Sequence, residues 1–175
     1  MKKVLIVVDM QKDFVNESLG TTEAISIVPN VVRKISNFDG EIFVTMDTHY
    51  DDYLDTSEGK KLSVKHCIEG TPGWELDENI YEALKNKKHT IVRKGTFGSV
   101  DLPKFISKKY GYEGFSIELV GLCTDICVVS NALILKAFFP EVEITVDASC
   151  CAGVTPKKHE AAIETMKSCQ INIVE

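Results

Sequence analysis

The chain lacks the features that mark membrane proteins, nucleic-acid-binding proteins and disulfide scaffolds. Its densest apolar stretches, Val4–Val8 and Cys127–Phe139, are short or interrupted, whereas a membrane helix needs about 20 apolar residues. Basic residues (20) are fewer than acidic ones (26), and the net charge of −6 disfavours nucleic acid or an anionic membrane as a partner. Six irregularly spaced cysteines are too few for a disulfide framework at this length.

The remaining composition is that of one globular domain covering residues 1–175. The chain is 44% hydrophobic and 26% charged, without repeats, linkers or low-complexity segments. The apolar run after Lys2 and Lys3 stops at Asp9, and no small-residue cleavage site follows. We therefore expect a cytoplasmic protein whose cysteines are reduced and mostly buried.

Short β-branched runs alternate with helical patterns along the chain. Strands are predicted at Val4–Val8, Ile42–Thr45, Thr90–Val92, Ser116–Val120, Glu143–Val146 and Ile171–Val174. Helices are predicted at Pro29–Ser36, Asp77–Asn86, Leu102–Tyr110, Thr124–Phe139 and Pro156–Ser168, the last with Thr155 as its N-cap. Strands that are apolar throughout and separated by crossover helices predict an α/β fold, a three-layer α/β/α sandwich with a mostly parallel six-stranded sheet.

Polar residues follow four of the predicted strands, and ligands of open parallel sheets bind at these carboxyl ends. Asp9 follows the first strand, Asp47 and His49 the second, and Lys94 the third, while Cys127 lies near the start of the helix after the fourth. The helix N-terminus and Lys94 are expected to favour the thiolate of Cys127, and Asp9 can accept a proton. Alone, each is more simply a buried cysteine, a solvated amine or a turn former; together they favour catalysis.

The segment Asp47–Gly73 is polar and aperiodic, and loops of that length are usually functional. Asp47 and His49 would lie on the same side of an extended segment, and Glu58 and His66 follow within the loop. Mixed oxygen and nitrogen ligands suit zinc, iron or manganese. The alternative is that both histidines are ordinary hydrogen-bonded loop residues. We expect no functional role for His89 and His159.

Five motifs in order resemble the nicotinamidase/pyrazinamidase group of the isochorismatase-like cysteine hydrolases. They are V-D-M-Q-K-D-F around Asp9, V-T-x-D-x-H ending at His49, H-C-x-x-G-T-x-G from His66, R-K-G-T-F at Lys94, and G-L-C-T-D-I-C-V ending at Val128. The resemblance runs essentially end to end. The D-x-H motif and the later histidine single out the nicotinamidase branch.

The resemblance implies a Cys127 nucleophile, an Asp9 general acid/base and Lys94 as the third member of the triad. The backbone amides of Cys123 and Cys127 would form the oxyanion hole, and a cis peptide is expected between Leu122 and Cys123. Relatives of this group can also be homo-oligomers.

The resemblance further implies one divalent metal ion, zinc before iron or manganese, bound by Asp47, His49 and His66, with Glu58 as the fourth ligand. Phe14 and Phe97 correspond to the aromatic walls around a pyridine ring, although ordinary core packing would explain them nearly as well. The implied reaction is hydrolysis of nicotinamide, and of pyrazinamide, to the acid and ammonia in NAD salvage.

One departure affects the substrate. Many nicotinamidases have Trp-Pro shortly before the metal-binding histidine, where this chain has Ser63-Val64-Lys65, and Trp74 lies beyond the motif. A cysteine amidohydrolase acting on another small amide, such as a carbamoyl or ureido compound, is therefore an alternative. Others are an isochorismatase, a non-catalytic member that keeps a metal, and a thiol or zinc-storage role for Cys123, Cys127, Cys150 and Cys151.

Overall fold

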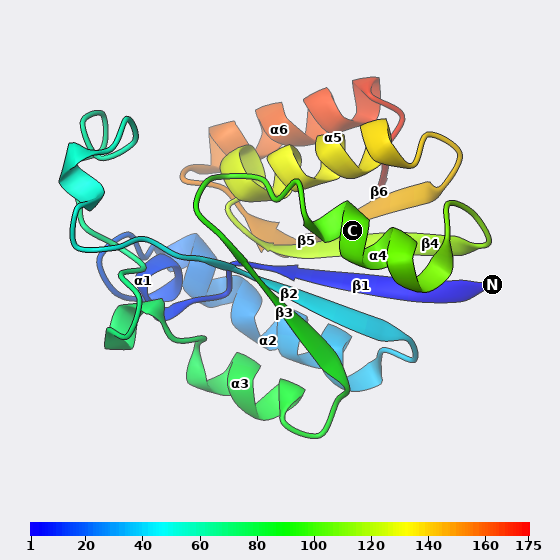
Figure 1. Ribbon diagram of the computed structural model, residues 1–175, viewed down its shortest axis with the longest axis horizontal. Coiled ribbons are helices and arrows are strands. Elements are labelled where there is room, and N and C mark those ends of the chain that lie inside the picture. Colours follow the sequence, from blue (N-terminus) through cyan, green and yellow to red (C-terminus); the bar gives the residue numbers. More distant parts are fainter.

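The computed structural model describes residues 1–175, and its six strands form one parallel sheet (Figure 1). The strands are β1 (Lys2–Val8), β2 (Glu41–Asp47), β3 (His89–Lys94), β4 (Phe115–Leu122), β5 (Glu143–Ala152) and β6 (Asn172–Val174). Their order is β3-β2-β1-β4-β5-β6, and every neighbouring pair is parallel. The predicted three-layer α/β/α architecture is confirmed.

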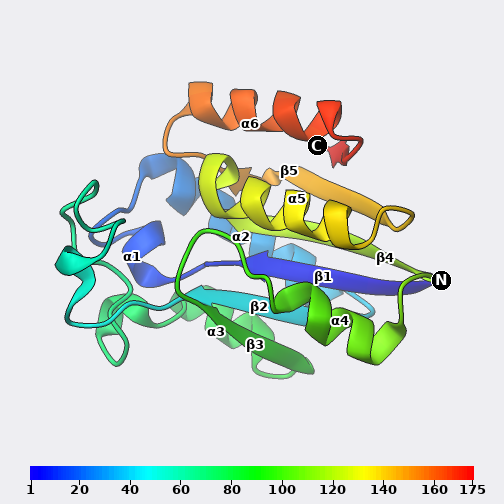
Figure 2. The same ribbon diagram turned by 45° about the horizontal axis from the view of Figure 1, so that its top comes forward.

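Helices cover both faces of the sheet (Figure 2). They are α1 (Lys12–Val15), α2 (Thr22–Asn37), α3 (Glu78–Leu84), α4 (Leu102–Tyr110), α5 (Val129–Phe138) and α6 (Pro156–Ser168). Helices α1, α2 and α3 pack on one face, and α4, α5 and α6 pack on the other. None of the helices combines the length and apolar character that crossing a bilayer requires.

The central strand β1 explains why the strand patterns are apolar throughout. Val4, Ile6 and Val8 belong to the core under α4, α5 and α6, whereas Leu5 and Val7 belong to the core under α1, α2 and α3. All five side chains have no exposed surface. Two buried faces leave no polar position from Val4 to Val8, so the next polar residue, Asp9, marks the point where the chain leaves the sheet.

The predicted helix Pro29–Ser36 begins too late. Helix α2 starts at Thr22, and the side chain of its N-cap, Thr21, accepts a hydrogen bond from the N–H of Ala24 (3.0 Å). Pro29 lies inside the helix on its exposed side, where water can satisfy the carbonyl that lacks a partner. The packing of Ala24, Ile27 and Val28 against the sheet stabilises a turn that the proline alone would interrupt.

The other helices agree more closely with their sequence patterns. Helices α4 and α6 have the predicted bounds, and the hydroxyl of Thr155 caps α6 by accepting from the N–H of Lys158. The predicted helix Thr124–Phe139 is two elements, a π-helical turn η3 (Thr124–Val128) followed by α5. The segment Asp47–Gly73 has only the short 3₁₀ turn η1 (Tyr53–Asp55) and, at its end, η2 (Pro72–Trp74).

A partly buried ion-pair cluster ties α2 to the sheet. The ammonium of Lys34 lies 2.7 Å from the carboxylate of Asp147 and also contacts Glu118. Burial alone would raise the pKa of Asp147, but hydrogen bonds from Lys34 and Ser149 lower it below its ordinary value. Asp147 is thus held in its charged form by the folded structure.

Replacing Asp147 tests this electrostatic contribution. Asp147→Asn is expected to lower the free energy of unfolding at pH 7 by about 1–2 kcal/mol, since one charged hydrogen-bond partner of Lys34 is lost. The folded pKa of Asp147 lies below its unfolded value, so this difference should persist above about pH 4 and shrink as the pH falls further. Urea unfolding from pH 3 to pH 8 measures it.

The exposed pair Glu164–Lys167 (2.8 Å) supplies the control. Glu164→Gln should leave the free energy of unfolding nearly unchanged, because solvent screens an exposed pair. A difference at position 147 that does not depend on pH would contradict the electrostatic explanation.

Candidate active site

The carboxyl ends of the strands deliver the predicted catalytic side chains to one edge of the sheet. Strand β1 ends at Val8, and Asp9 takes a left-handed backbone conformation (φ 47°) that turns the chain out of the sheet. Its N–H donates to the carbonyl of Thr45 (3.2 Å), and the Thr45 hydroxyl donates to its carboxylate (2.7 Å). Asp9 is completely buried, so its carboxylate needs partners inside the protein.

Close backbone packing beside Asp9 depends on Gly121 in β4. A Cβ atom there would lie 2.2 Å from the carbonyl oxygen of Val8, and the φ of Gly121 is 121°. Any side chain would force β1 and β4 apart. The glycine therefore brings the turn that follows β4 next to the end of β1.

Lys94 is the centre of this edge. Its ammonium lies 2.7 Å from Oδ2 of Asp9, 3.2 Å from Oδ1 of Asp47 and 3.6 Å from Sγ of Cys127, and it donates to the carbonyl of Thr96 (2.9 Å). The structure thus brings the predicted Cys–Lys–Asp group together. It also joins this group to Asp47.

The electrostatics of the triad differ from expectation at the thiol. Burial and the nearby Asp9 carboxylate raise the pKa of Cys127 well above its usual value, although Lys94 opposes them. The proposed thiolate is therefore not the resting form: the helix start was expected to dominate, but Cys127 lies at the fourth position of η3 and is only 5% exposed. The resting group is a thiol.

Of the other two members, Asp9 is suited to proton transfer and Lys94 to holding a permanent charge. Burial raises the pKa of Asp9 in spite of the Lys94 charge, which makes its carboxylate a stronger base than an ordinary aspartate. Burial would lower the pKa of Lys94, but the nearby carboxylates of Asp9 and Asp47 raise it, so the ammonium stays charged. The site therefore holds a thiol, a basic carboxylate and a fixed cation.

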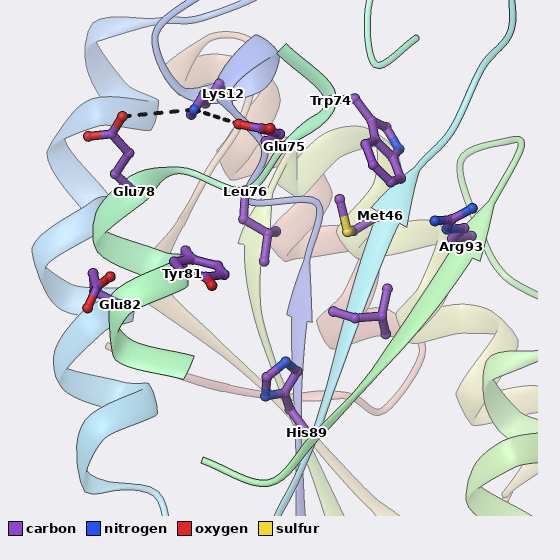
Figure 3. A pocket seen from close by; sticks show the side chains of 11 residues that line it. Lys12, Met46, Trp74, Glu75, Leu76, Glu78, Tyr81, Glu82, His89 and Arg93 are labelled. Atoms are coloured by element: carbon purple, nitrogen blue, oxygen red, sulfur yellow. Dashed lines mark hydrogen bonds and ion pairs between the residues drawn. The ribbon is translucent and has the colours of Figure 1, made fainter. Parts of the chain in front are cut away.

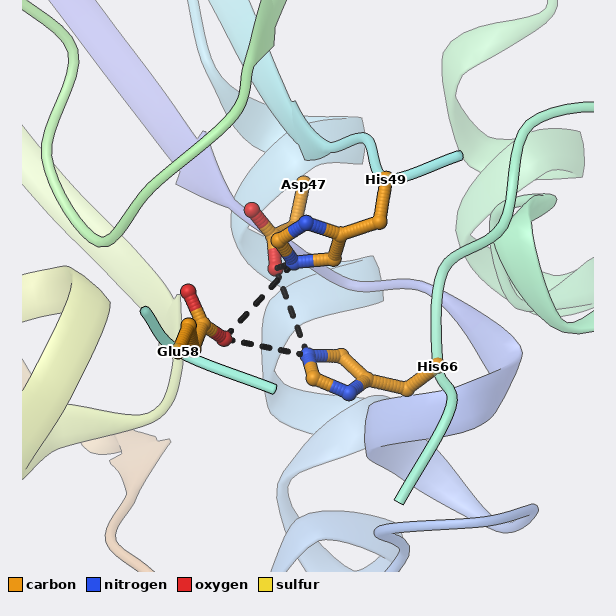
Figure 4. Close-up of side chains that lie close together, drawn as sticks. All are labelled: Asp47, His49, Glu58 and His66. Carbon is orange, nitrogen blue, oxygen red and sulfur yellow. Dashed lines mark hydrogen bonds and ion pairs between the residues drawn. The ribbon is translucent and has the colours of Figure 1, made fainter. Parts of the chain in front are cut away.

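Asp47, His49, Glu58 and His66 converge beside the triad (Figure 4). Nε2 of His49 lies 3.0 Å from Oδ2 of Asp47 and 3.7 Å from Oε1 of Glu58. Nε2 of His66 lies 3.6 Å from each of the same two oxygens. One atom from each residue falls in a group whose members are all within 4.8 Å of one another.

This donor set fits a divalent metal ion. Zinc binds imidazole nitrogen and carboxylate oxygen at about 2.0–2.2 Å, so tetrahedral ligands lie roughly 3.3–3.6 Å apart. The four distances between the histidine nitrogens and the carboxylate oxygens, 3.0–3.7 Å, are close to that range. Two carboxylates and two imidazoles also match the ligand preference of iron and manganese.

Surrounding residues orient the two imidazoles. Nδ1 of His66 contacts the carbonyl of Val64 (2.9 Å), which leaves Nε2 facing the cluster. The buried ring of Tyr53 packs 4.7 Å from the His49 ring and 5.0 Å from the His66 ring. The ring of Phe14 lies 5.4 Å from His66. Phe14 thus borders the cluster, while its assigned part in binding a pyridine ring stays a prediction.

Asp13 positions the second histidine and was missed by the sequence analysis. Its Oδ2 accepts a 2.7 Å hydrogen bond from the N–H of Cys67, which has a left-handed conformation (φ 48°), and its Oδ1 accepts from the Ser18 hydroxyl. A Cβ at Gly73 would lie 2.3 Å from the same carboxylate. The only available signal was the place of Asp13 in the first motif.

Asn131 and Gln11 were also missed. Asn131 donates to the carbonyls of Cys127 (2.8 Å) and Phe97 (3.3 Å) and accepts from the N–H of Ser99 (3.0 Å). It therefore fixes the turn that carries the thiol against the loop after β3. Gln11 likewise makes three hydrogen bonds to backbone groups, two with the peptide groups of Asp47 and one with the carbonyl of Trp74.

The remaining predicted residues lie near the site. The peptide between Leu122 and Cys123 is cis, and the carbonyl of Cys123 accepts from the N–H groups of Ile126 and Val128 (both 3.0 Å). The oxyanion role of Cys123 and Cys127 stays a prediction. Phe97 is 44% exposed, and its role as an aromatic wall is likewise still a prediction.

The histidines and cysteines left without a role have local partners. Nδ1 of His159 contacts the hydroxyl of Thr124 (2.8 Å), and Nδ1 of His89 contacts the carbonyl of Lys87 (2.9 Å). Cys150 and Cys151 are free and buried. Burial raises the pKa of Cys150 to about 11, which disfavours a reactive thiol there.

A separate cavity of about 940 Å³ lies between α3 and the edge strand β3 (Figure 3). None of the predicted catalytic or metal residues lines it. Trp74 faces it, with its indole N–H bonded to the Thr48 hydroxyl (3.0 Å) and the Arg93 guanidinium 4.9 Å from its ring. Trp74 therefore does not take the place of the tryptophan that many nicotinamidases have before the metal-binding histidine, because it faces this separate cavity.

Known proteins share both the sequence pattern and the fold. The isochorismatase domain family matches residues 3–175. A curated nicotinamidase of Saccharomyces cerevisiae is 23% identical to this chain. The alignment, 217 residues long including gaps, covers 99% of each protein. The crystal structure of a nicotinamidase/pyrazinamidase from Bacillus subtilis superposes with a TM-score of 0.85 at 28% identity, covering 100% of both chains.

A structure of pyrazinamidase from Pyrococcus horikoshii, in complex with zinc, superposes with a TM-score of 0.83 at 27% identity. It covers 100% of this chain and 99% of the other. The relatives match the whole chain, and the domain family covers nearly every residue. Accordingly, this chain belongs to the isochorismatase domain family of hydrolases.

Proposed function

We propose that the protein is a metal-dependent cysteine amidohydrolase that converts nicotinamide, and pyrazinamide, to the acid and ammonia in cytoplasmic NAD salvage. One observation carries the proposal. Lys94 contacts Asp9 and Cys127 on one side and Asp47 of the four-residue cluster on the other. A nucleophile, a base and a place for a metal ion thus share one buried cation.

The first half of the reaction uses Asp9 and Cys127. Asp9 takes the proton of the Cys127 thiol, and the sulfur attacks the amide carbon of the substrate. The backbone amides of Cys123 and Cys127 are assigned to hold the resulting oxyanion, an interaction worth about 3–4 kcal/mol for one donor. Asp9 then gives its proton to the amide nitrogen, and the C–N bond breaks. Ammonia departs, and the acyl group remains bound to Cys127 as a thioester.

The second half releases the acid. Asp9, again ionised, takes a proton from a water molecule that attacks the thioester carbon. The C–S bond breaks, and the proton returns to the sulfur, so that the thiol and the carboxylate are both regenerated. Lys94 stays charged throughout and stabilises the negative charge that moves between Asp9 and Cys127.

Asp47, His49, Glu58 and His66 would hold the metal ion. When bound, such an ion supplies a Lewis acid to which the ring nitrogen of a pyridine or pyrazine carboxamide can bind, which orients the amide toward Cys127. The zinc complex of the Pyrococcus horikoshii relative supports a divalent ion in this family. Zinc is the ion we assign first.

A cysteine amidohydrolase for another small amide is the second candidate. Ser63, Val64 and Lys65 precede His66 where many nicotinamidases have Trp-Pro, so part of the expected aromatic floor is absent. The four-residue cluster favours nicotinamide, because a carbamoyl or ureido substrate offers no ring nitrogen to a metal ion. Ammonia release from a panel of amides separates the two candidates.

The nucleophile can be tested by removing its sulfur. Cys127→Ala is expected to lower ammonia release from nicotinamide by about 10³-fold or more, because no covalent step remains. Circular dichroism should show an unchanged fold, since only one small buried atom is lost. As a matched control, Cys169→Ala changes the cysteine that follows α6, at the edge where the strands begin, and should retain full activity. Robust turnover by Cys127→Ala would remove Cys127 from this role.

Metal removal should affect substrates according to their ring nitrogen. After chelation, kcat/KM for nicotinamide is expected to fall about 100-fold (~2.7 kcal/mol of transition-state stabilisation) and to return when Zn²⁺ is added. Benzamide has the same shape without the nitrogen, so its slower hydrolysis should change less than about threefold. Equal losses for both amides would contradict anchoring through the ring, and no loss for either would contradict a metal requirement.

The charge on Asp9 should control the protonation of Cys127. Asp9→Asn removes a negative charge that raises the pKa of the thiol and leaves Lys94 in place, so thiolate should form at a lower pH than in the wild type. Alkylation of Cys127 by iodoacetamide, followed from pH 6 to pH 11 by site-resolved mass spectrometry, measures the midpoint. The variant should react faster at neutral pH while hydrolysing no amide. An unchanged or higher midpoint would argue against Asp9 as the proton acceptor.

A further inference from the structure

The ladder between β1 and β2 stops just before the candidate active site. Its last paired residues are Val8 and Thr45, after which Asp9 turns out of the sheet. Asp47 lies two residues beyond Thr45, and its peptide groups can no longer be paired by the backbone of β1. Buried peptide groups need partners, so another group has to replace the missing strand.

The side chain of Gln11 replaces it. Its Oε1 accepts from the N–H of Asp47 (2.8 Å), and its Nε2 donates to the carbonyl of Asp47 (2.8 Å). A carboxamide has the same donor and acceptor as a peptide, so it extends the ladder by one step. The same Nε2 also donates to the carbonyl of Trp74 (2.8 Å), and Gln11 has no exposed surface.

Asp47 is the residue whose orientation matters most at this edge. Its Oδ1 lies 3.2 Å from the ammonium of Lys94, and its Oδ2 lies 3.0 Å from Nε2 of His49. The two oxygens therefore serve two different systems, the triad and the candidate metal cluster. A rotation of the Asp47 peptide would move both oxygens together and misplace at least one.

We propose that Gln11 is a positioning residue that sets the metal affinity of the cluster by fixing the backbone of Asp47. The proposal rests on the metal site of the proposed function. Gln11 touches neither the four ligand atoms nor the reacting atoms; it acts through Asp47. Supporting residues of this kind commonly change metal affinity by about 10–100-fold.

Asn131 provides a matched comparison within the same chain. It is also a carboxamide without exposed surface, and it also makes three hydrogen bonds to backbone groups. Its partners belong to Cys127, Phe97 and Ser99, on the nucleophile side of the site. Loss of its bonds should loosen the thiol and leave the metal ligands in place.

The experiment compares Gln11→Met with Asn131→Leu, since each replaces a carboxamide by an apolar side chain of similar size. Zn²⁺ affinity is measured on the purified full chain by competition with a chromophoric chelator, together with the thermal midpoint of the metal-free protein. We expect Gln11→Met to weaken Zn²⁺ binding at least tenfold and Asn131→Leu to change it less than twofold. Both should lower the midpoint by similar amounts, because each loses two buried hydrogen bonds and one partly buried one.

A second variant covers the case in which Gln11→Met does not fold. Gln11→Glu keeps the shape and the acceptor for the Asp47 N–H, but places an oxygen against the carbonyls of Asp47 and Trp74, so Zn²⁺ binding should again weaken at least tenfold. Wild-type affinity in either folded Gln11 variant, or an equal loss in Asn131→Leu, would overturn the proposal.

Zn²⁺ binding and amide hydrolysis are measured independently, so the role of Gln11 and the proposed function can be refuted separately. If the wild-type protein hydrolyses nicotinamide without binding Zn²⁺, the role of Gln11 is refuted, and the proposed amidohydrolase activity still stands. Wild-type protein that binds Zn²⁺ with the expected loss in Gln11→Met, but hydrolyses no amide, would support the role of Gln11 and refute the proposed function.

Discussion

The buried ammonium of Lys94 is the interaction on which the active-site edge depends. An unpaired cation in this environment would be prohibitively costly, so the structure keeps the carboxylates of Asp9 and Asp47 within 2.7 and 3.2 Å of it. The same cation lies 3.6 Å from the sulfur of Cys127. The triad and the four-residue cluster are therefore not two neighbouring sites, because they share one charge and neither can move without disturbing the other.

The parallel sheet brings these groups to one edge, where the ladder between β2 and β3 still pairs Asp47 with Lys94. Pairing between β1 and β2, in contrast, ends at Val8 and Thr45, and beyond that point buried side chains bind backbone groups that β1 no longer reaches. Gln11 holds the peptide of Asp47, and Asn131 holds the carbonyl of Cys127. A site built this way combines a rigid scaffold with local polar contacts whose geometry is specific to each residue.

Features that depend on local sequence pattern can be predicted from the chain, whereas features that depend on tertiary contacts cannot. Val4–Val8 was predictable as a strand because burial on both faces leaves an uninterrupted apolar run, and Thr155 as a cap because its role is local. The start of helix α2 was wrongly predicted at Pro29, because tertiary packing stabilises the helical turns before a proline that locally disfavours them. Gln11 could not be assigned, since its partner lies 36 residues away. The resting state of Cys127 likewise depends on burial, which no spacing of residues reveals.

The aromatic residues around the cluster bear on the choice of substrate. Tyr53 packs against both histidines of the four-residue cluster and Phe14 against one of them, so these rings support the two imidazoles. Trp74 is engaged by Arg93 and Thr48 beside a different cavity. With no tryptophan before His66, stacking contributes less to recognition under the proposed function. Selectivity among flat aromatic amides would then depend chiefly on a ring nitrogen that reaches the four-residue cluster. Benzamides, which have the same shape, would be distinguished from nicotinamide by the lack of that single atom.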